Sequence, residues 1–152
     1  MAVHPSFRGK GLGRRLLEAN TSVGLSRGAA LSRGLIRIDN KASQITFTRC
    51  SYEKDDPLLS LYVALPGRQR DVLRRFRKGW QQTQVVTFNY SGIWLEEAIY
   101  TKSIDLSELP EPDEMSVGFL LPSKNESLAR TALDLGCAEL GQFHWWQHKY
   151  VV

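Results

Sequence analysis

The stretch VHPSFRGKGLGRRLL, residues 3–17, decides how the rest of the chain is interpreted. It passes from a short apolar piece through a proline break and a glycine-rich turn into a helical pattern. The apolar residues of that pattern are spaced by four, three and four positions, which predicts the buried face of a helix: Leu12, Leu16, Ala19 and Val23. Gly24 or Gly28 is suited to end the helix. We therefore expect a strand at residues 2–4, a loop, and a helix that begins at the loop.

The loop RGKGLG, residues 8–13, has the composition of a pyrophosphate cradle. Its alternating glycines let a ligand approach the backbone, so that several amide N–H groups can converge on it. The next helix directs its positive end to the same place. Full charges come from four basic side chains: Arg8, Lys10, Arg14 and Arg15. The alternative is a glycine-rich turn with solvated arginines.

Two familiar phosphate loops do not match this stretch. A Walker A loop requires GxxxxGK[ST], and a dinucleotide-binding fingerprint requires GxGxxG with an acidic residue further on for the ribose. Here the glycines occupy positions 9, 11 and 13, and no acidic residue stands at the ribose position.

Two ordered stretches resemble the GNAT superfamily of acyl-CoA-dependent N-acetyltransferases. VHPSFRGKGLGRRLL resembles motif A, a strand ending in V-x-P followed by [QR]xxGx[GA] and a helix. The matching residues are Val3, Pro5, Arg8, Gly11 and Gly13. DNKASQITFTRCSYEK, residues 39–54, is similar to the NxxAxxxYxxxGF region, with Asn40 and Ala42 in place. Where the family commonly has Tyr, Gly and Phe, this chain has Phe47, Ser51 and Tyr52.

The resemblance implies an α/β (α+β) fold, with a mixed twisted sheet flanked by helices. It also implies acetyl-CoA (coenzyme A) as cofactor and an amine of a small molecule or peptide as acceptor. The implied cofactor-binding residues are Val3, Arg8, Gly9, Lys10, Gly11, Leu12, Gly13, Arg14 and Asn40. The amides of residues 9–14 would bind the pyrophosphate, residues 2–4 would pair with the pantetheine arm, and Asn40 would bond that arm.

Catalysis is harder to assign. The tyrosine that often protonates the leaving thiolate in this family aligns with Phe47, which has no proton to give, so the acid would be Tyr52 or solvent. The base is unassigned, because Glu96 and Glu97 could line a pocket or a solvated edge. A non-catalytic acyl-CoA-binding module is therefore the alternative function.

The family resemblance covers about residues 1–54, and we expect a division into residues 1–56 and 57–152 that together form one compact unit. Family members usually have several strands before motif A. A truncated start, a rearranged order and a second partial copy would each explain this chain. The C-terminal stretch from residue 116 also resembles the family's strand, helix and strand after motif A. It echoes residues 35–65, because Asn125 and Ser127 repeat Asn40 and Ser43.

The rest of the sequence predicts further strands and helices. Strands are expected at 35–39, 58–65 and 116–121, a short helix after Asn40, a hairpin within 83–104 around NYSG at 89–92, and an exposed loop at 107–115. A basic helix at 68–80 would face inward through Val72, Leu73 and Phe76. A helix after Asn125 would stop at Gly136, before an aromatic strand.

Composition limits the class of protein. The 152 residues are 42% hydrophobic and 24% charged, which is enough apolar material for a core, and the net charge is +4. Cys50 and Cys137 lie far apart with no CxxC spacing, so we expect neither a disulfide framework nor a cysteine zinc site. No apolar run is long enough for a membrane span or a secretory signal, so we expect a cytoplasmic protein.

Three further hypotheses concern partners. The basic segment 68–78 could bind nucleic acid, but we favour a solvated helix face with the acidic residues of 105–114 as an internal partner. His144 and His148 share one face of the predicted aromatic strand but have no third metal ligand, so we expect no metal site. That strand could pair across subunits, which predicts a homodimer.

Overall fold

The computed structural model describes residues 3–65, 67–75, 80–86, 91–97 and 116–150. The chain forms two compact units, which we call unit 1 (Met1–Pro57 with Phe143–Val152) and unit 2 (Leu58–Gln142). Both contain helices and strands, so the predicted α/β class is confirmed. The elements in chain order are η1 (Pro5–Phe7), α1 (Leu12–Ser26), β1 (Leu31–Arg37), α2 (Lys41–Arg49), β2 (Glu53–Lys54), β3 (Leu59–Ala64), α3 (Gln69–Arg75), β4 (Trp80–Val86), β5 (Ser91–Glu97), β6 (Ser116–Pro122), α4 (Glu126–Asp134) and β7 (Cys137–Lys149).

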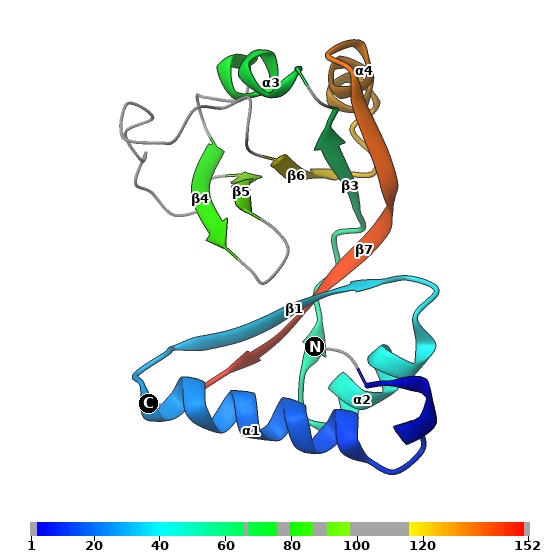
Figure 1. The fold of residues 1–152 in the computed structure, drawn as a ribbon, viewed down its shortest axis with the longest axis vertical. Coiled ribbons are helices and arrows are strands. Elements are labelled where there is room, and N and C mark those ends of the chain that lie inside the picture. Colours follow the sequence, from blue (N-terminus) through cyan, green and yellow to red (C-terminus); the bar gives the residue numbers. More distant parts are fainter. Residues whose placement is uncertain (1–2, 66, 76–79, 87–90, 98–115, 151–152) are drawn as a thin grey trace. The chain divides into compact units, whose positions relative to one another are not determined.

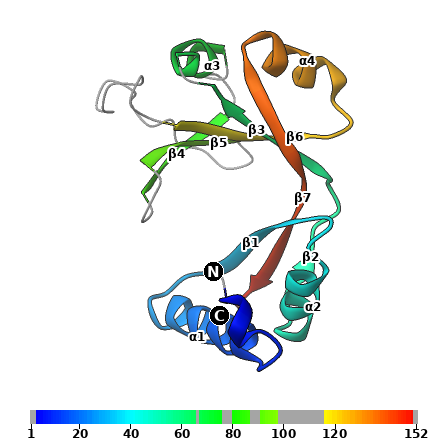
Figure 2. The same ribbon diagram turned by 45° about the vertical axis from the view of Figure 1, so that its right-hand side comes forward.

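In unit 1, the last part of β7 lies between β1 and β2. It pairs antiparallel with all of β1, from Leu31↔Lys149 to Arg37↔Phe143, and also with β2. Helices α1 and α2 lie on the same face of this ribbon (Figure 1 and Figure 2). The aromatic strand expected to pair across subunits therefore pairs within the chain, and the homodimer stays a prediction.

The close packing of α2 on β1 requires a glycine in the strand. A Cβ atom on Gly34 would lie 2.6 Å from Cε1 of Phe47, so only glycine lets this ring approach the backbone. The ring of Phe47 also meets that of Tyr52 edge-on, with centroids 4.8 Å apart. The buried core around them consists of Leu17, Ile36, Tyr52 and Trp146.

Hydroxyl groups tie α1 to the sheet of unit 1. Thr21 donates its single hydroxyl proton to the Leu17 carbonyl at 2.8 Å, so it accepts from the Tyr52 hydroxyl at 2.7 Å. The Tyr52 oxygen in turn accepts from Ser32 at 2.6 Å. From the end of the chain, the Tyr150 hydroxyl donates to the Thr21 carbonyl at 2.6 Å.

Unit 2 has a larger apolar core. β3 pairs antiparallel with β6, β6 pairs parallel with β5, and β5 pairs antiparallel with β4. Phe119, Leu121 and Val117 of β6 are fully buried. The predicted inward residues Val72 and Leu73 of α3 are buried as expected, whereas Phe76 lies outside the described residues.

Two expectations about the N-terminus are wrong within the described residues. Val3 and His4 form no strand, because Pro5 opens a 3₁₀ turn directly after them. Helix α1 forms where predicted, but its predicted buried face does not: Leu16, Ala19 and Val23 are exposed. Only Leu17 is buried, since the side of α1 that meets the sheet carries the smaller Thr21 and Gly24.

Most remaining predictions are confirmed with shifted ends. The strand predicted at 35–39 is β1, which begins four residues earlier, at Leu31. It also ends two residues earlier, at Arg37, because Ile38 and Asp39 belong to the turn before α2. β4 and β5 form the expected hairpin, but Ser91 and Gly92 of the predicted NYSG turn belong to β5, and residues 89 and 90 lie outside the described residues. The loop expected at 107–115 lies outside them entirely. Gly28 follows the C-cap of α1 with φ +77°.

The echo between the two stretches is structural. Asn40 caps α2 by accepting from the Ser43 amide at 3.1 Å, and Asn125 caps α4 by accepting from the Leu128 amide at 3.1 Å. The backbone angles of the two caps are φ −82°, ψ 70° and φ −90°, ψ 77°. Each cap follows a strand, and each helix leads into another strand.

Candidate functional site

The glycine loop has a conformation that only glycine adopts easily. Gly9 and Gly11 have φ values of +77° and +72°, in the left-handed region. A Cβ atom added at either position would meet nothing within 4 Å, so the space beside the loop is open. Gly11 is the N-cap of α1 and makes no side-chain cap. Both glycines therefore leave backbone accessible at the start of a helix.

Unbonded amides line this loop. Arg15 is the first residue of the helix to donate backward, to the Gly11 carbonyl at 3.1 Å. Among the described residues, no backbone or side-chain acceptor is found for the N–H groups of residues 9–14. The first turn of a helix carries partial positive charge, which favours an anion. The loop therefore offers a set of available N–H donors, and its role as a pyrophosphate cradle stays a prediction.

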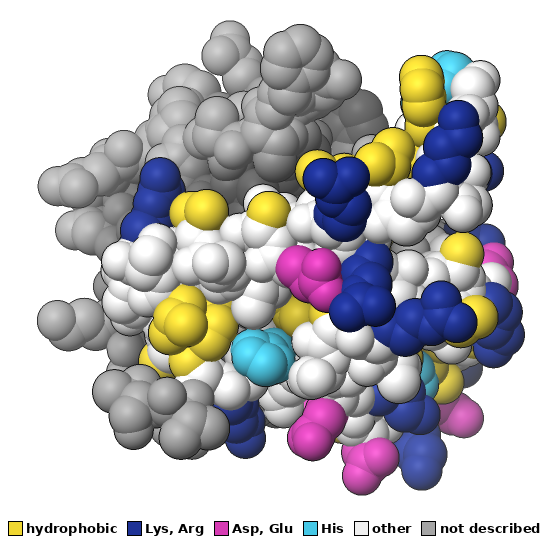
Figure 3. Space-filling view, turned by 90° about the horizontal axis from the view of Figure 1, so that it is seen from below, with side chains coloured by type: hydrophobic (Ala, Val, Ile, Leu, Met, Phe, Trp, Pro, Cys, Tyr) yellow, Lys and Arg dark blue, Asp and Glu magenta, His cyan; other side chains and the backbone are white. Residues whose placement is uncertain are grey.

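Six exposed basic side chains surround the loop and the neighbouring α2: Arg8, Lys10, Arg14, Arg15, Lys41 and Arg49. Lys and Arg side chains gather toward the side of the molecule where the N-terminal half of α1 lies (Figure 3). Arg14 is held by Glu18 at 2.7 Å, which raises the pKa of its guanidinium. The Lys10 ammonium lies 5.5 Å from the Phe7 ring centroid.

A groove of about 570 Å³ runs between the loop and α2, within unit 1. From the predicted binding residues it is lined by Val3, Arg8, Gly9, Gly11, Leu12, Gly13, Arg14 and Asn40, but not by Lys10. The other lining residues were not predicted to bind the cofactor: Phe7, Ala42, Ser43, Thr46, Phe47 and Arg49. Of these, Ala42 and Phe47 belong to the second motif. The spacing of the α2 residues by three or four positions is the signal that marks one helix face.

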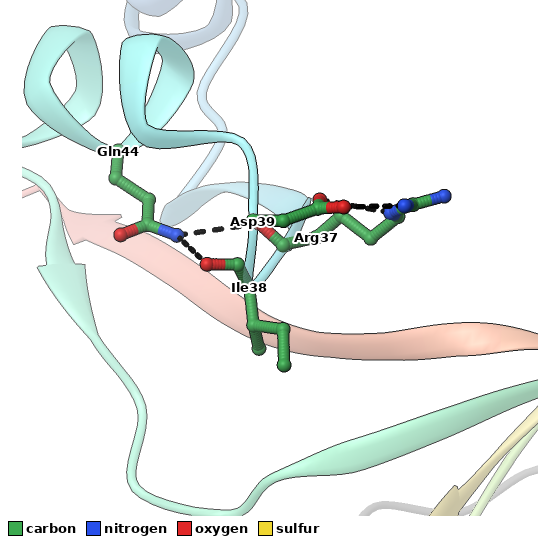
Figure 4. Close-up of polar contacts among 4 residues, drawn as sticks. All are labelled: Arg37, Ile38, Asp39 and Gln44. Atoms are coloured by element: carbon green, nitrogen blue, oxygen red, sulfur yellow. Dashed lines mark hydrogen bonds and ion pairs between the residues drawn. The ribbon is translucent and has the colours of Figure 1, made fainter.

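Asn40 connects the groove to the turn that precedes α2. Its Oδ1 accepts the capping hydrogen bond, and its side-chain NH₂ group is the part of Asn40 that can donate to a ligand. The turn itself is held by Gln44, whose Nε2 donates to the carbonyls of Arg37 and Ile38 (Figure 4). On the outer side, Arg37 forms an ion pair with Asp39, whose hydrogen bond to the guanidinium lowers the pKa of the Asp39 carboxyl.

The two residues considered for protonation differ in position. Phe47 lines the groove with an aromatic ring that has no proton to give. Tyr52 is buried, and its hydroxyl proton is committed to Thr21. Tyr52 therefore does not reach the groove, although it packs behind Phe47.

The other candidate residues from the sequence do not line this groove. His144 and His148 lie in β7, and their Nδ1 atoms are 3.0 Å from the carbonyl oxygens of Asp55 and Ser51. Within the described part of the chain, no three His, Cys, Asp or Glu side chains are arranged to hold a metal ion. Cys50 and Cys137 are both free. Glu96 and Glu97 belong to β5.

The basic helix α3 exposes Arg70, Arg74 and Arg75 while burying its apolar side. This arrangement agrees with the solvated-face interpretation. None of the helices in the described ranges combines the length and the apolar character needed to cross a membrane.

The comparison with protein families agrees with the geometry. Residues 1–52 match the profile of the Acetyltransferase (GNAT) family, which confirms the resemblance drawn from the two motifs. The matched stretch comprises the loop, α1, β1 and α2. No curated protein matches the chain significantly.

One solved structure extends the likeness in fold over almost the whole chain. A tandem GNAT protein from the clavulanic acid biosynthesis pathway, solved without AcCoA, is 9% identical with a TM-score of 0.50; the match covers 97% of this chain and 73% of that one. A candidate acetyltransferase from Thermoplasma acidophilum is 15% identical with a TM-score of 0.44, covering 97% and 66%. This chain therefore spans less than two thirds of the latter's length. The tandem protein supports a GNAT-type fold.

Proposed function

We propose that unit 1 binds acetyl-CoA and that the protein transfers its acetyl group to an amine. The observation that carries the proposal is the set of available N–H groups at residues 9–14, placed at a helix N-terminus and beside an open groove. Such a cradle suits a pyrophosphate. A groove of about 570 Å³ is also of the size that small-molecule ligands occupy.

Different residues would contact different parts of acetyl-CoA. The amides of residues 9–14 would bind the pyrophosphate, with Arg8 and Arg14 adding charge, and the NH₂ group of Asn40 would bond the pantetheine arm. Phe47 would form the apolar end of the groove. When bound, acetyl-CoA supplies an activated acetyl thioester, and this chain supplies position and charge.

A second candidate is acyl-CoA binding without turnover. In the described part of the groove, the only hydroxyl groups are those of Ser43 and Thr46, and Thr46 donates to the Ala42 carbonyl at 2.9 Å. No carboxylate lines these described walls. With Tyr52 committed elsewhere, the favoured source of the proton is solvent, which supports slow transfer or none.

The test is calorimetric titration with acetyl-CoA of the full chain and of two variants, Gly11→Asp and Gly11→Asn. Asp and Asn have the same shape and both tolerate left-handed backbone, so the pair isolates the effect of charge. We expect micromolar binding by the unmodified chain and by Gly11→Asn, and at least about tenfold weaker binding by Gly11→Asp.

Equal affinities of the two variants would contradict a pyrophosphate at the loop, provided that both remain folded by circular dichroism. If binding is confirmed, release of free thiol with a panel of amines separates the two candidates. Thiol release above the background hydrolysis rate supports transfer, and its absence with every amine supports binding alone.

A further inference from the structure

Gln44 fastens helix α2 to the end of strand β1. Its Nε2 lies 2.9 Å from the Ile38 carbonyl oxygen and 3.3 Å from that of Arg37 (Figure 4). One side-chain NH₂ group thus bonds the last residue of β1 and the first residue of the turn. Gln44 itself does not line the groove.

Residues 37–40 of the same turn also form hydrogen bonds with one another. The Asn40 amide donates to the Arg37 carbonyl at 3.0 Å, and Nε of Arg37 bonds the Asp39 carboxylate at 2.8 Å. Four residues of backbone are therefore held by a helix side chain on one side and an ion pair on the other. The ion pair is exposed and between charged groups, so salt weakens it, whereas the Gln44 hydrogen bonds join neutral groups.

This turn positions two groove residues. Asn40 accepts from the Ser43 amide, and the side chains of both line the groove. A shift of the turn would move the NH₂ group of Asn40 away from a ligand. The polar contacts of Gln44 therefore act on the site through Asn40.

Unit 2 shows that the turn forms without such a contact. The Asn125 amide donates to the Pro122 carbonyl at 2.8 Å, as Asn40 does to Arg37. Four residues after Asn125 stands Ala129, in the place that Gln44 has after Asn40. A methyl group donates no hydrogen bond, yet the cap and the turn are the same. Folding of this turn alone does not account for Gln44.

We propose that Gln44 is a positioning residue of the acyl-CoA groove, which holds the 37–40 turn so that Asn40 presents its NH₂ group to the ligand. The inference rests on the proposed function. It assigns a role in binding to a residue outside the groove.

The first test compares Gln44→Ala with Thr48→Ala by calorimetric titration with acetyl-CoA. Thr48 is a matched control, because it lies one turn further along α2, is exposed, and bonds only the Gln44 carbonyl at 3.0 Å. We expect about fivefold weaker binding for Gln44→Ala and no more than about twofold change for Thr48→Ala. Equal affinities would overturn the proposal.

The second test uses Gln44→Glu. An ionised carboxylate would face two carbonyl oxygens that can only accept, whereas the protonated acid can donate to one of them. Its affinity relative to the unmodified chain should be lowest near pH 8 and recover toward pH 5. A ratio that does not change with pH would overturn the proposal.

A third measurement needs no ligand. Hydrogen exchange of the Ser43 amide reports whether Asn40 Oδ1 stays in place, and we expect faster exchange in Gln44→Ala than in Thr48→Ala. Unchanged exchange would overturn the positioning role. Failure of the unmodified chain to bind acetyl-CoA would instead overturn the proposed function, so the two failures are distinguishable.

Discussion

The strand–helix–strand of unit 1, β1–α2–β2, and that of unit 2, β6–α4–β7, are built alike and used differently. Both helices span nine residues and follow an asparagine cap. In unit 2 the helix buries Ala132 in an apolar core, whereas α2 has no fully buried residue and turns one face to a groove. The same local structure therefore contributes to an apolar core in one unit and to the wall of a groove in the other.

The two units also differ in net charge. Unit 1 holds eleven Lys and Arg against five Asp and Glu, a net charge of +6, and unit 2 holds nine against eleven, a net charge of −2. The overall value of +4 conceals this contrast. An anionic ligand is favoured by unit 1 alone, where the available amides also lie.

In each unit, strands that lie far apart in the sequence pair with each other. β3 follows β2 in the chain but pairs with β6 of unit 2. β7 begins in unit 2, and its last residues pair with β1 and β2 of unit 1. The candidate site near residue 11 thus depends on residues near 146.

The largest expected effect tests this dependence. Trp146→Ala removes a buried ring that packs with Leu17 of α1, and we expect a loss of about 3–5 kcal/mol in the free energy of unfolding. Because α1 carries the cradle at its N-terminus, acetyl-CoA binding should be lost as well. Denaturant unfolding and calorimetric titration measure the two effects.

Leu140→Ala is the matched control on the same strand. Leu140 is 51% exposed in the unit 2 part of β7, so its removal should change stability by no more than about 0.5 kcal/mol and leave binding intact. Retained binding in a destabilised Trp146→Ala protein would show that the loop does not need the C-terminal strand.

The second prediction concerns the two cysteines, one in each unit. Burial raises the pKa of the Cys137 thiol to about 11 from an ordinary value of 9.0, and also raises the pKa of the half-buried Cys50. Above pH 9 the unfolded chain releases this proton while the folded chain keeps it. The stabilising contribution is therefore complete below pH 9 and is lost as the pH rises toward 11.

Urea unfolding between pH 8 and 11 measures this slope, which has an upper limit of about 1.4 kcal/mol per pH unit for one group. Comparison with Cys137→Ala and Cys50→Ala subtracts the titration of all other groups. The slope should become shallower in Cys137→Ala by more than in Cys50→Ala. An equal change in both would contradict the contrast between the two units.

Much of this architecture could be predicted from the sequence because its signals are local. Glycines at positions 9 and 11 adopt the backbone that they alone favour, and asparagines at 40 and 125 cap the helices that follow them. These outcomes depend on a few neighbouring residues.

The errors arise where tertiary contacts outweigh local pattern. The apolar spacing of α1 predicts burial of Leu16 and Val23, but Tyr150 approaches α1 so closely that a Cβ on Gly24 would lie 2.9 Å from its hydroxyl. The sequence near α1 does not indicate that Tyr150, more than a hundred positions away, contacts this helix. The hydrogen bonds of Gln44 could not be predicted from the sequence either, since its partners are backbone carbonyls.

The smallest expected effect exchanges one residue between the two units. The residue after the C-cap is Ser51 in unit 1, with φ +60°, and Gly136 in unit 2, with φ +77°. Left-handed backbone costs about 1–2 kcal/mol for a residue with a Cβ, and a glycine at position 51 would remove this cost. Part of the gain in stability is offset because glycine has greater conformational freedom in the unfolded chain. Ser51→Gly should therefore stabilise the protein by about 0.5 kcal/mol.

The reverse change carries an additional penalty. A Cβ on Gly136 would lie 3.0 Å from Cγ of Arg68, so Gly136→Ser should destabilise by more than Ser51→Gly stabilises, by about 1–2 kcal/mol. Thermal unfolding of both variants checks the order and the sign. Since the Ser51 carbonyl still accepts from His148 in Ser51→Gly, a loss of stability there would mean that the serine side chain contributes more than its backbone strain costs. Unit 1 would then need serine for a contact, whereas unit 2 needs glycine for space.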